Sequence, residues 1–417
     1  MTKTGFVSAA LASVLMLAGC ASDATTDTDP EEDATTEEPE TDDEPADDDG
    51  SATGDDSSGD VDTDEGAAAG DWEPGDAWDA GAPEEWAEVL QACQEDEGTV
   101  VVAGFPFLAD AMAEGFEADT GVALEWLGGD GSANSARFEQ EARADNLTID
   151  ILLGGGRELQ TLLPEGLLEP VKPQMILPSV QDGPWWRDGT RHWYDTEQQY
   201  LFQGAGWVFG YVTVNADEID PDSITVWDDL LKPEFEGQII AYDPSTNGPG
   251  QGATGFMGAR RGSDYLEELY IGQDVEFVQD NDQLIEAVAR GTNPIGLYVI
   301  QSSIERFKED FNLEVILPTD DPGYITSGFS VLKQATGAPH PNCAQVYINW
   351  YASPSGQTIY QNVMSAASNR VDIDKSGLPE YVIPQEGVEY FDDNTEEFYT
   401  GERQEYIEEV TELLGGR

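Results

Sequence analysis

The chain has 417 residues, enough for one large domain or for two lobes with separate cores. It carries 85 acidic and 18 basic residues, a formal net charge of −67, which excludes nucleic acid as a natural partner because phosphate binding needs the opposite sign. Such a charge suits either a protein that works at high salt, where screening weakens self-repulsion, or an ordinary acidic secreted protein.

The first twenty residues are typical of a secretory signal. Lys3 supplies a positive start, and Phe6–Leu17 is an apolar run too short to cross a bilayer as a permanent helix. The sequence Leu-Ala-Gly-Cys that ends at Cys20 resembles the lipobox of prokaryotic lipoproteins, which implies cleavage before Cys20 and lipidation of its side chain. A transmembrane anchor and an ordinary signal with a chance cysteine are the alternatives. We expect a protein held by a lipid anchor at the outer face of the cytoplasmic membrane.

Residues 21–83 are dominated by Asp, Glu, Thr, Ala, Gly and Pro and show no apolar periodicity. From Ala21 to Glu85 there are 27 acidic residues and no Lys or Arg. This composition predicts a disordered, self-repelling linker between the anchor and the folded part. Calcium binding by the acidic run is the alternative.

Ordered sequence begins near Pro83, with an amphipathic helix predicted over Glu84–Glu95. Three units of strand, Gly-rich loop and helix follow, with strands at Val100–Ala103, Val122–Leu127 and Ile149–Leu153. Alternating strands and helices predict an α/β fold with a mostly parallel sheet, whose strand ends are the usual place for a ligand. We assign residues 84–205 to the first lobe.

The long apolar run Tyr200–Asn215 contains glycines that let it bend between two sheets, so we expect it to be the first crossing between lobes. Residues 206–322 are assigned to a second lobe with its own mostly parallel sheet and flanking helices. Its strands are predicted at Ile239–Tyr242, Val275–Val278, Pro294–Ile300 and Leu313–Leu317. Gly323–Leu332 is predicted to cross back, which returns residues 323–417 to the first lobe and to the C-terminal helices.

Several short motifs occur in an order that resembles the extracellular solute-binding proteins of ABC importers, in the branch of ferric-ion, phosphonate and thiamine binders. The motifs are Asp150–Leu153, Leu167–Pro170, Trp227–Leu230, Lys232–Gly237, Asp243-Pro244, Pro339–Ala344 and Asn349–Gln357. The similarity covers about Glu85 to Met364. It implies the type II periplasmic-binding-protein fold, in which two α/β lobes joined by two hinge crossings close on a small solute.

The loop Asp243–Gly252 is rich in glycine and hydroxyl groups and precedes a predicted helix. Backbone N–H groups at a helix N-terminus, with Thr246, Asn247 and Gln251 nearby, suit carboxylate or phosphate oxygens. The alternative is a turn whose Ser or Thr only caps the helix. Arg157 follows the third Gly-rich loop and either pairs with an acidic ligand or balances a nearby carboxylate.

Four aromatic residues are candidates for the walls of the site: Phe105, Phe107, Trp126 and Trp207. Each of them, taken alone, also fits a core position. We expect Phe105 and Arg157 to contact the ligand from the first lobe, because the strand-end loops of both sheets face one cleft when the crossings act as a hinge.

The ferric-ion-binding members of this branch bind the metal with neighbouring tyrosines on a strand of the second lobe, whereas this chain has only Tyr298 there. Tyr324 is the further candidate, but Fe³⁺ prefers several phenolate or carboxylate oxygens. Tyr298 and Gln301 suit a polar organic or oxyanion ligand better. We therefore expect no metal and no other cofactor, and keep ferric-ion binding as the alternative.

Cys93 and Cys343 are the two cysteines that remain after Cys20, in a compartment where disulfides persist. We predict that they form a disulfide bridge; two independent buried thiols are the alternative.

The function expected is uptake of a small polar or anionic solute by a monomer that delivers it to a membrane permease. The alternatives are an extracytoplasmic ligand sensor and a surface hydrolase. An enzyme is not expected, because the two histidines, His192 and His340, are far apart in sequence and no Gly-x-Ser-x-Gly motif occurs.

Overall fold

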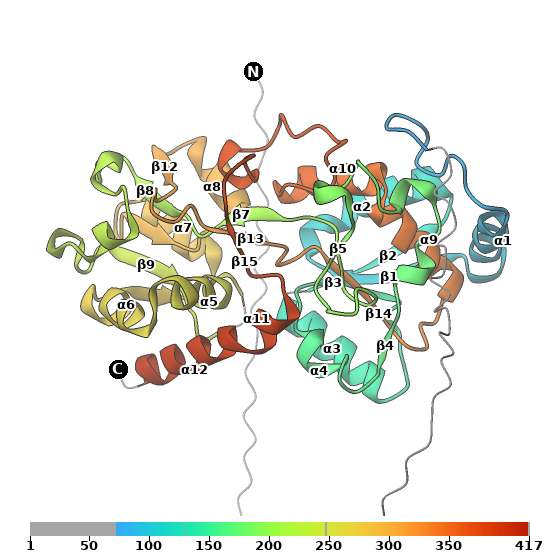
Figure 1. Cartoon of the computed structure of the whole chain (residues 1–417), viewed down its shortest axis with the longest axis horizontal. Helices are drawn as coiled ribbons and strands as arrows, with labels where there is room; N and C mark the ends of the chain where they lie inside the picture. The colour runs from blue at the N-terminus through green and yellow to red at the C-terminus, as the bar shows by residue number, and fades with distance from the viewer. Residues whose placement is uncertain (1–71, 130, 247, 416–417) are drawn as a thin grey trace, which may run out of the picture. The chain divides into compact units, whose positions relative to one another are not determined.

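The computed structural model describes residues 72–129, 131–246 and 248–415. Two sheets lie at the centres of two lobes, with helices packed around each of them (Figure 1). The predicted two-lobe α/β fold is confirmed. Cys20 and the signal segment lie outside the described residues, and no described helix is long and apolar enough to span a membrane.

The first-lobe sheet has the order β2-β1-β3-β14-β6-β5, with β4 paired to β14. Its strands are β1 (Thr99–Gly104), β2 (Ala123–Gly128), β3 (Ile151–Gly154), β4 (Leu168–Glu169), β5 (His192–Trp193), β6 (Phe202–Gln203) and β14 (Val331–Ala335). β1 pairs in parallel with β2 and β3, as the strand–helix alternation predicts. β14 runs antiparallel to β3 because it enters this lobe from the opposite direction, so the sheet is mixed.

The second-lobe sheet has the order β10-β9-β11-β8-β12. Its strands are β8 (Val212–Asn215), β9 (Ile239–Tyr242), β10 (Glu276–Val278), β11 (Ile295–Leu297) and β12 (Leu313–Ile316). β9 pairs in parallel with β10 and β11, whereas β8 arrives from the other lobe and runs antiparallel to β11 and β12. This sheet is therefore mixed for the same reason.

Helices cover both sheets. Those that pack with the first lobe are α1 (Glu84–Ala92), α2 (Ala109–Thr120), α3 (Gly131–Arg143), α4 (Glu158–Thr161), α9 (Pro341–Ala352) and α10 (Pro354–Met364). Those of the second lobe are α5 (Pro249–Arg261), α6 (Ser263–Glu267), α7 (Asn281–Ala289) and α8 (Gln301–Lys308). Each lobe has its own apolar core, built on buried strands such as Val100–Ala103 and Ile239–Ala241.

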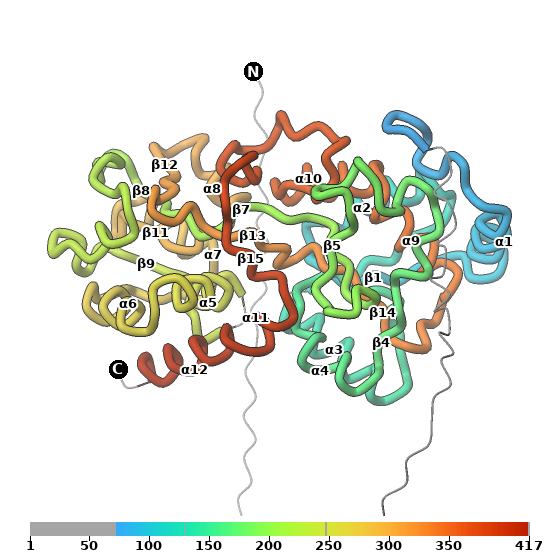
Figure 2. The backbone as a smooth tube through the Cα atoms, in the orientation of Figure 1, coloured from blue at the N-terminus to red at the C-terminus, as the bar shows by residue number. Residues whose placement is uncertain are grey.

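The chain passes between the lobes through a three-stranded sheet of β15 (Phe391–Asp392), β13 (Tyr324–Thr326) and β7 (Trp207–Phe209), which lies between the two larger sheets (Figure 2). The run Tyr200–Asn215 bends as predicted, because it supplies β6 to the first lobe, β7 to the crossing and β8 to the second lobe. Gly210, between β7 and β8, has a φ of 84°, which glycine adopts without strain.

The C-terminal segment adds a third connection between the lobes. β15 leads into α11 (Glu396–Thr400), where the Gln160 side chain at α4 donates to the Tyr399 carbonyl, and then into α12 (Glu402–Gly415). α12 packs along α5 of the second lobe (Figure 1). Residues 323–417 are predicted to return to the first lobe and the C-terminal helices, whereas the end of this segment contacts both lobes.

The predicted linker ends earlier than residue 83. Trp72 is only 3% exposed, and its ring lies 5.1 Å from the ring of Trp185. The guanidinium of Arg370 lies 5.4 Å from the Trp72 ring and 4.9 Å from that of Trp186. The folded part therefore already includes Trp72, and the acidic residues Glu73, Asp76 and Asp79 that follow belong to it.

Cys93 and Cys343 form a disulfide in the structure, with an S–S distance of 2.01 Å. Their Cα atoms are 4.7 Å apart although 250 positions separate them in sequence. The bond joins the end of the first helical segment to α9, and both residues are buried in the first-lobe core.

Candidate functional site

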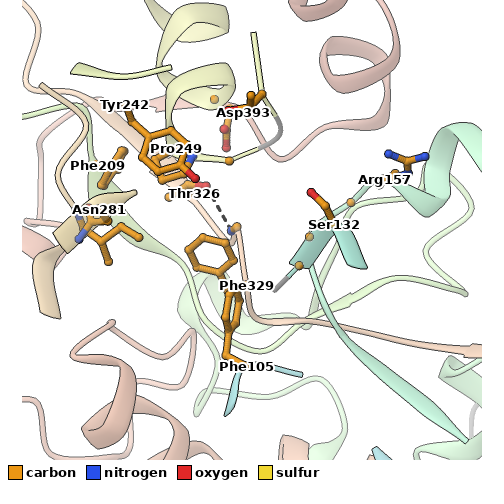
Figure 3. Close-up of a pocket in the computed structure, with 18 of the residues that line it drawn as sticks. Phe105, Ser132, Arg157, Phe209, Tyr242, Pro249, Asn281, Thr326, Phe329 and Asp393 are labelled. Carbon is orange, nitrogen blue, oxygen red and sulfur yellow. Dashed lines mark hydrogen bonds between the residues drawn. The ribbon is translucent and has the colours of Figure 1, made fainter. Parts of the chain in front are cut away.

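A cavity of about 520 Å³ lies between the lobes and is lined from both of them (Figure 3). Helices α3, α5, α7 and α8 begin at this cavity, because each follows the loop at a strand end that faces it. The residues at these four N-termini that line it are Gly131 and Ser132, Gly248 and Pro249, Asp280 and Asn281, and Ile300 and Gln301. The positive ends of the helix dipoles and part of the N-terminal N–H groups therefore surround one space, although Pro249 has no N–H and the Asp280 side chain already accepts from the Gln283 N–H at the start of α7.

Five of the predicted ligand contacts line the cavity: Phe105, Arg157, Thr246, Gln301 and Tyr324. The Arg157 Nε donates to Glu139 Oε1 at 2.8 Å, and its side chain is 44% exposed. Arg157 therefore balances the Glu139 carboxylate, and its exposed part can also pair with an acidic ligand, so both predicted roles are compatible with its position. The Thr246 hydroxyl donates to the Asp243 carbonyl at 3.1 Å, and the Gln301 amide donates to the Met364 carbonyl at 3.2 Å.

Two predicted contacts do not line the cavity, and one cannot be placed. Tyr298 is fully buried, and its hydroxyl lies 2.7 Å from that of Tyr270 in the second-lobe core. The reason is local: β11 ends at Leu297, and a φ of 68° at Tyr298 changes the direction of its side chain. Gln251 is half-buried on α5 away from the lining, and Asn247 lies outside the described residues.

Aromatic side chains form much of the cavity wall. Phe105 and Phe329 (Figure 3) meet edge to face with ring centroids 4.7 Å apart. Trp207 lines the cavity as predicted. Phe107 instead stacks on the far side of Phe105 and is 55% exposed. Trp126 supports the wall from behind, where its indole nitrogen donates to the Phe105 carbonyl at 3.0 Å.

Several cavity residues were not predicted from sequence. They are Ser135, Tyr194, Phe209, Tyr242, Gln279, Asn281, Thr326, Asp393, Tyr399 and Arg403. The last three come from the C-terminal segment. One signal was present: Gly252, Gly255 and Gly258 recur every third residue, a spacing that places small residues on one face of a helix and allows another helix to approach closely.

Three of the tyrosine hydroxyls that line the cavity are neutral at neutral pH. Burial raises the pKa of Tyr194 and Tyr324 well above the ordinary value of about 10, and raises that of Tyr399 as well. These phenols can therefore donate hydrogen bonds to a ligand oxygen. Among the described residues, no group of three or more His, Cys, Asp or Glu side chains could hold a metal ion.

Comparison with known proteins places this architecture in context. Residues 111–376 match the family model of bacterial extracellular solute-binding proteins. A curated uncharacterised protein of Haemophilus influenzae is 25% identical over 228 residues, which are 52% of this chain and 62% of that protein. The chain thus spans about three fifths of the length of that curated relative.

Two solved structures show the same fold at low identity. Iron-bound HitA from Pseudomonas aeruginosa is 17% identical and superposes with a TM-score of 0.58 over 76% of this chain and 99% of its own. The periplasmic binding protein AfuA from Actinobacillus pleuropneumoniae, with fructose-6-phosphate bound, is 17% identical and has a TM-score of 0.59 over 75% of this chain and 97% of its own.

Proposed function

The chain belongs to the family of bacterial extracellular solute-binding proteins, and from this premise we propose that it captures a small anionic solute between its lobes and delivers it to an ABC importer. Membership of this family makes it a binding protein rather than an enzyme. The observation that carries the choice of an anion is the convergence of four helix N-termini on one cavity.

The cavity's size and walls support an organic anion rather than a bare ion. A volume of about 520 Å³ lies within the usual range of ~300–1,000 Å³ for small-molecule sites. The rings of Phe105 and Phe329 offer apolar contact to a carbon skeleton, while the helix N-termini and the neutral phenols offer hydrogen-bond donors to oxygens. A sugar phosphate or an aromatic or aliphatic carboxylate fits this combination.

Calorimetry against fructose 6-phosphate, a phosphonate, citrate, thiamine and ferric citrate tests this proposal. We expect saturable binding of at least one phosphate, phosphonate or carboxylate and none of thiamine. Ser132→Trp should abolish that binding, because the indole would fill the cavity at the start of α3. Ser376→Trp, at an exposed position that is not among the lining residues, is the matched control and should bind normally. Thiamine binding without any anion binding would contradict the proposal.

Ferric-ion binding is the second candidate, favoured by four tyrosines that line the cavity together with Asp393. Oxygen ligands of this kind suit Fe³⁺, but each phenol would have to lose its proton on binding. If iron is the cargo, Fe³⁺ should produce a tyrosinate charge-transfer band that is lost in Tyr324→Phe. A band that appears without any binding of iron-free anions would favour this candidate over the first.

We also propose that Cys20, outside the described residues, anchors the protein to the membrane by lipid. Several acyl chains on one cysteine stabilise attachment by ~0.8 kcal/mol for each buried CH₂ group. Cys20→Ser should therefore release the protein into the medium or leave uncut precursor, as measured by fractionation and intact mass. A Cys20→Ser protein that stays in the membrane fraction with a processed N-terminus would contradict the lipid anchor.

A further inference from the structure

Part of the cavity is lined by residues that lie beyond the C-terminal end of the region matched by the family model. The match ends at residue 376, yet Asp393, which follows β15, and Tyr399 and Arg403, on α11 and α12, line the cavity. Asp393 is labelled at the cavity in Figure 3, and α11 and α12 follow it across the lower side of the molecule in Figure 1. The C-terminal segment is thus part of the site and not only a terminal extension.

Close packing of α12 on α5 places Arg403 at the cavity. A Cβ atom at Gly255 would lie 2.7 Å from Arg403 Cγ, and one at Gly258 would lie 2.2 Å from Tyr406 Cγ. Only glycine permits this approach, since real Cβ contacts are not that short. The guanidinium then lies over the Tyr399 ring, 4.4 Å from its centroid.

Arg403 lacks a carboxylate partner in a strongly acidic protein. Its side chain makes no hydrogen bond and no ion pair within the part of the chain that the structure describes, although Arg403 is only 5% exposed. Its Nε atom is buried without a partner. A buried guanidinium left without an acceptor is costly unless a ligand supplies one.

Asp393 does not neutralise this charge. It is 3% exposed, its Oδ1 atom has no hydrogen-bond partner, and no ion pair joins it to Arg403 within 4.0 Å. Burial raises the pKa of the Asp393 carboxyl well above its ordinary value, while the nearby charge of Arg403 acts in the opposite direction. Since no hydrogen bond or ion pair joins the two side chains among the described residues, the guanidinium of Arg403 stays open to a ligand oxygen.

We propose that the C-terminal segment forms a specificity subsite in which the Arg403 guanidinium binds an anionic oxygen group of the solute, a phosphate or a carboxylate. This inference rests on the proposed function, because it names the residue that recognises the anion in the same cavity. Tyr399 orients the guanidinium from one side, and the glycine face of α5 supports it from the other.

The test compares full-length wild-type protein with Arg403→Gln, Arg403→Lys and Asp393→Asn. Binding of fructose 6-phosphate, inorganic phosphate and citrate is measured by calorimetry, and ligand that copurifies from the native cells is measured by native mass spectrometry. Arg403→Gln should weaken anion binding by about 10- to 100-fold, since charge-assisted hydrogen bonds are lost. Arg403→Lys should recover part of the affinity, and Asp393→Asn should stay within about threefold of wild type because Asp393 makes no hydrogen bond or ion pair to Arg403.

Arg290→Gln is the matched control, because it removes the same charge from an exposed pair with Glu286 outside the cavity. Equal binding by wild type and by a folded Arg403→Gln protein would overturn the subsite and leave the proposed function intact. Wild-type protein that binds none of the three anions and carries no copurified anion would overturn both. Circular dichroism and thermal melting identify a variant that has failed to fold. If Arg403→Gln fails to fold, Arg403→Lys provides the test. An Arg403→Lys protein that melts like wild type, binds with wild-type affinity and shows no preference between phosphate and citrate would count against the subsite.

Discussion

Replacement of Lys333 by Met should lower the free energy of unfolding by ~3–5 kcal/mol, as expected when one partner of a buried ion pair is removed. Lys333 lies on β14, and its Nζ atom is 3.1 Å from Glu158 Oε2, with both side chains fully buried. The same ammonium donates to the Gly155 carbonyl. Without it, the carboxylate of Glu158 would stay buried with no counter-charge.

The pair is also close to the cavity, since Gly155 and Gly156 line it. Burial lowers the pKa of Lys333, whereas the charge of Glu158 acts in the opposite direction. We therefore expect Lys333→Met to loosen the loop before α4 as well as to destabilise the first lobe. Urea denaturation followed by tryptophan fluorescence measures the free energy of unfolding.

Two further variants make this prediction specific. The double variant Lys333→Met with Glu158→Leu should recover most of the lost stability, because no charge then remains buried. Lys308→Met removes an equivalent ammonium from a partly exposed pair with Glu305 and should cost no more than ~1 kcal/mol. A loss for Lys333→Met as small as that for Lys308→Met would show that the buried pair is not formed.

The second large effect is expected from Gly258→Ala, which should displace α12 and weaken anion binding together. The added Cβ would lie 2.2–2.6 Å from three ring atoms of Tyr406, and these atoms are close to the α12 backbone. Overpacking of this kind costs ~1–3 kcal/mol or moves the helix. Since Arg403 lies on α12, we expect both a lower melting temperature and a weaker affinity for fructose 6-phosphate.

A double-mutant cycle tests whether the contact between the new methyl group and the Tyr406 ring causes the loss of stability. Tyr406→Ala combined with Gly258→Ala should lose less stability than the sum of the two single variants, because the ring that meets the new methyl group is gone. Gly415→Ala, on α12 like Tyr406 but with no atom within 4 Å of its added Cβ, should be close to wild type. Additive losses in the cycle would exclude the predicted contact between α5 and α12.

The order of strands and helices could be predicted from sequence because it depends on neighbouring residues. β1, β9 and β12 lie within one residue of their predicted bounds at both ends, and the apolar run Tyr200–Asn215 bends where its glycines occur. The pattern failed where a strand stops: Pro294–Ile300 was predicted as one strand, whereas β11 ends at Leu297 and α8 begins at Gln301. A buried apolar run contains no signal for that change of direction.

The site itself depended on tertiary structure. The sequence alone determined the two-lobe α/β class, the family resemblance and the Gly-rich loop before α5, all of which follow from local pattern. Only the tertiary structure decided that Tyr298 lies in the core, since a single positive φ changes the direction of its side chain. It likewise decided that Arg403 belongs to the cavity, because helix packing between α5 and α12 joins residues nearly 150 positions apart, and no local pattern contains that contact.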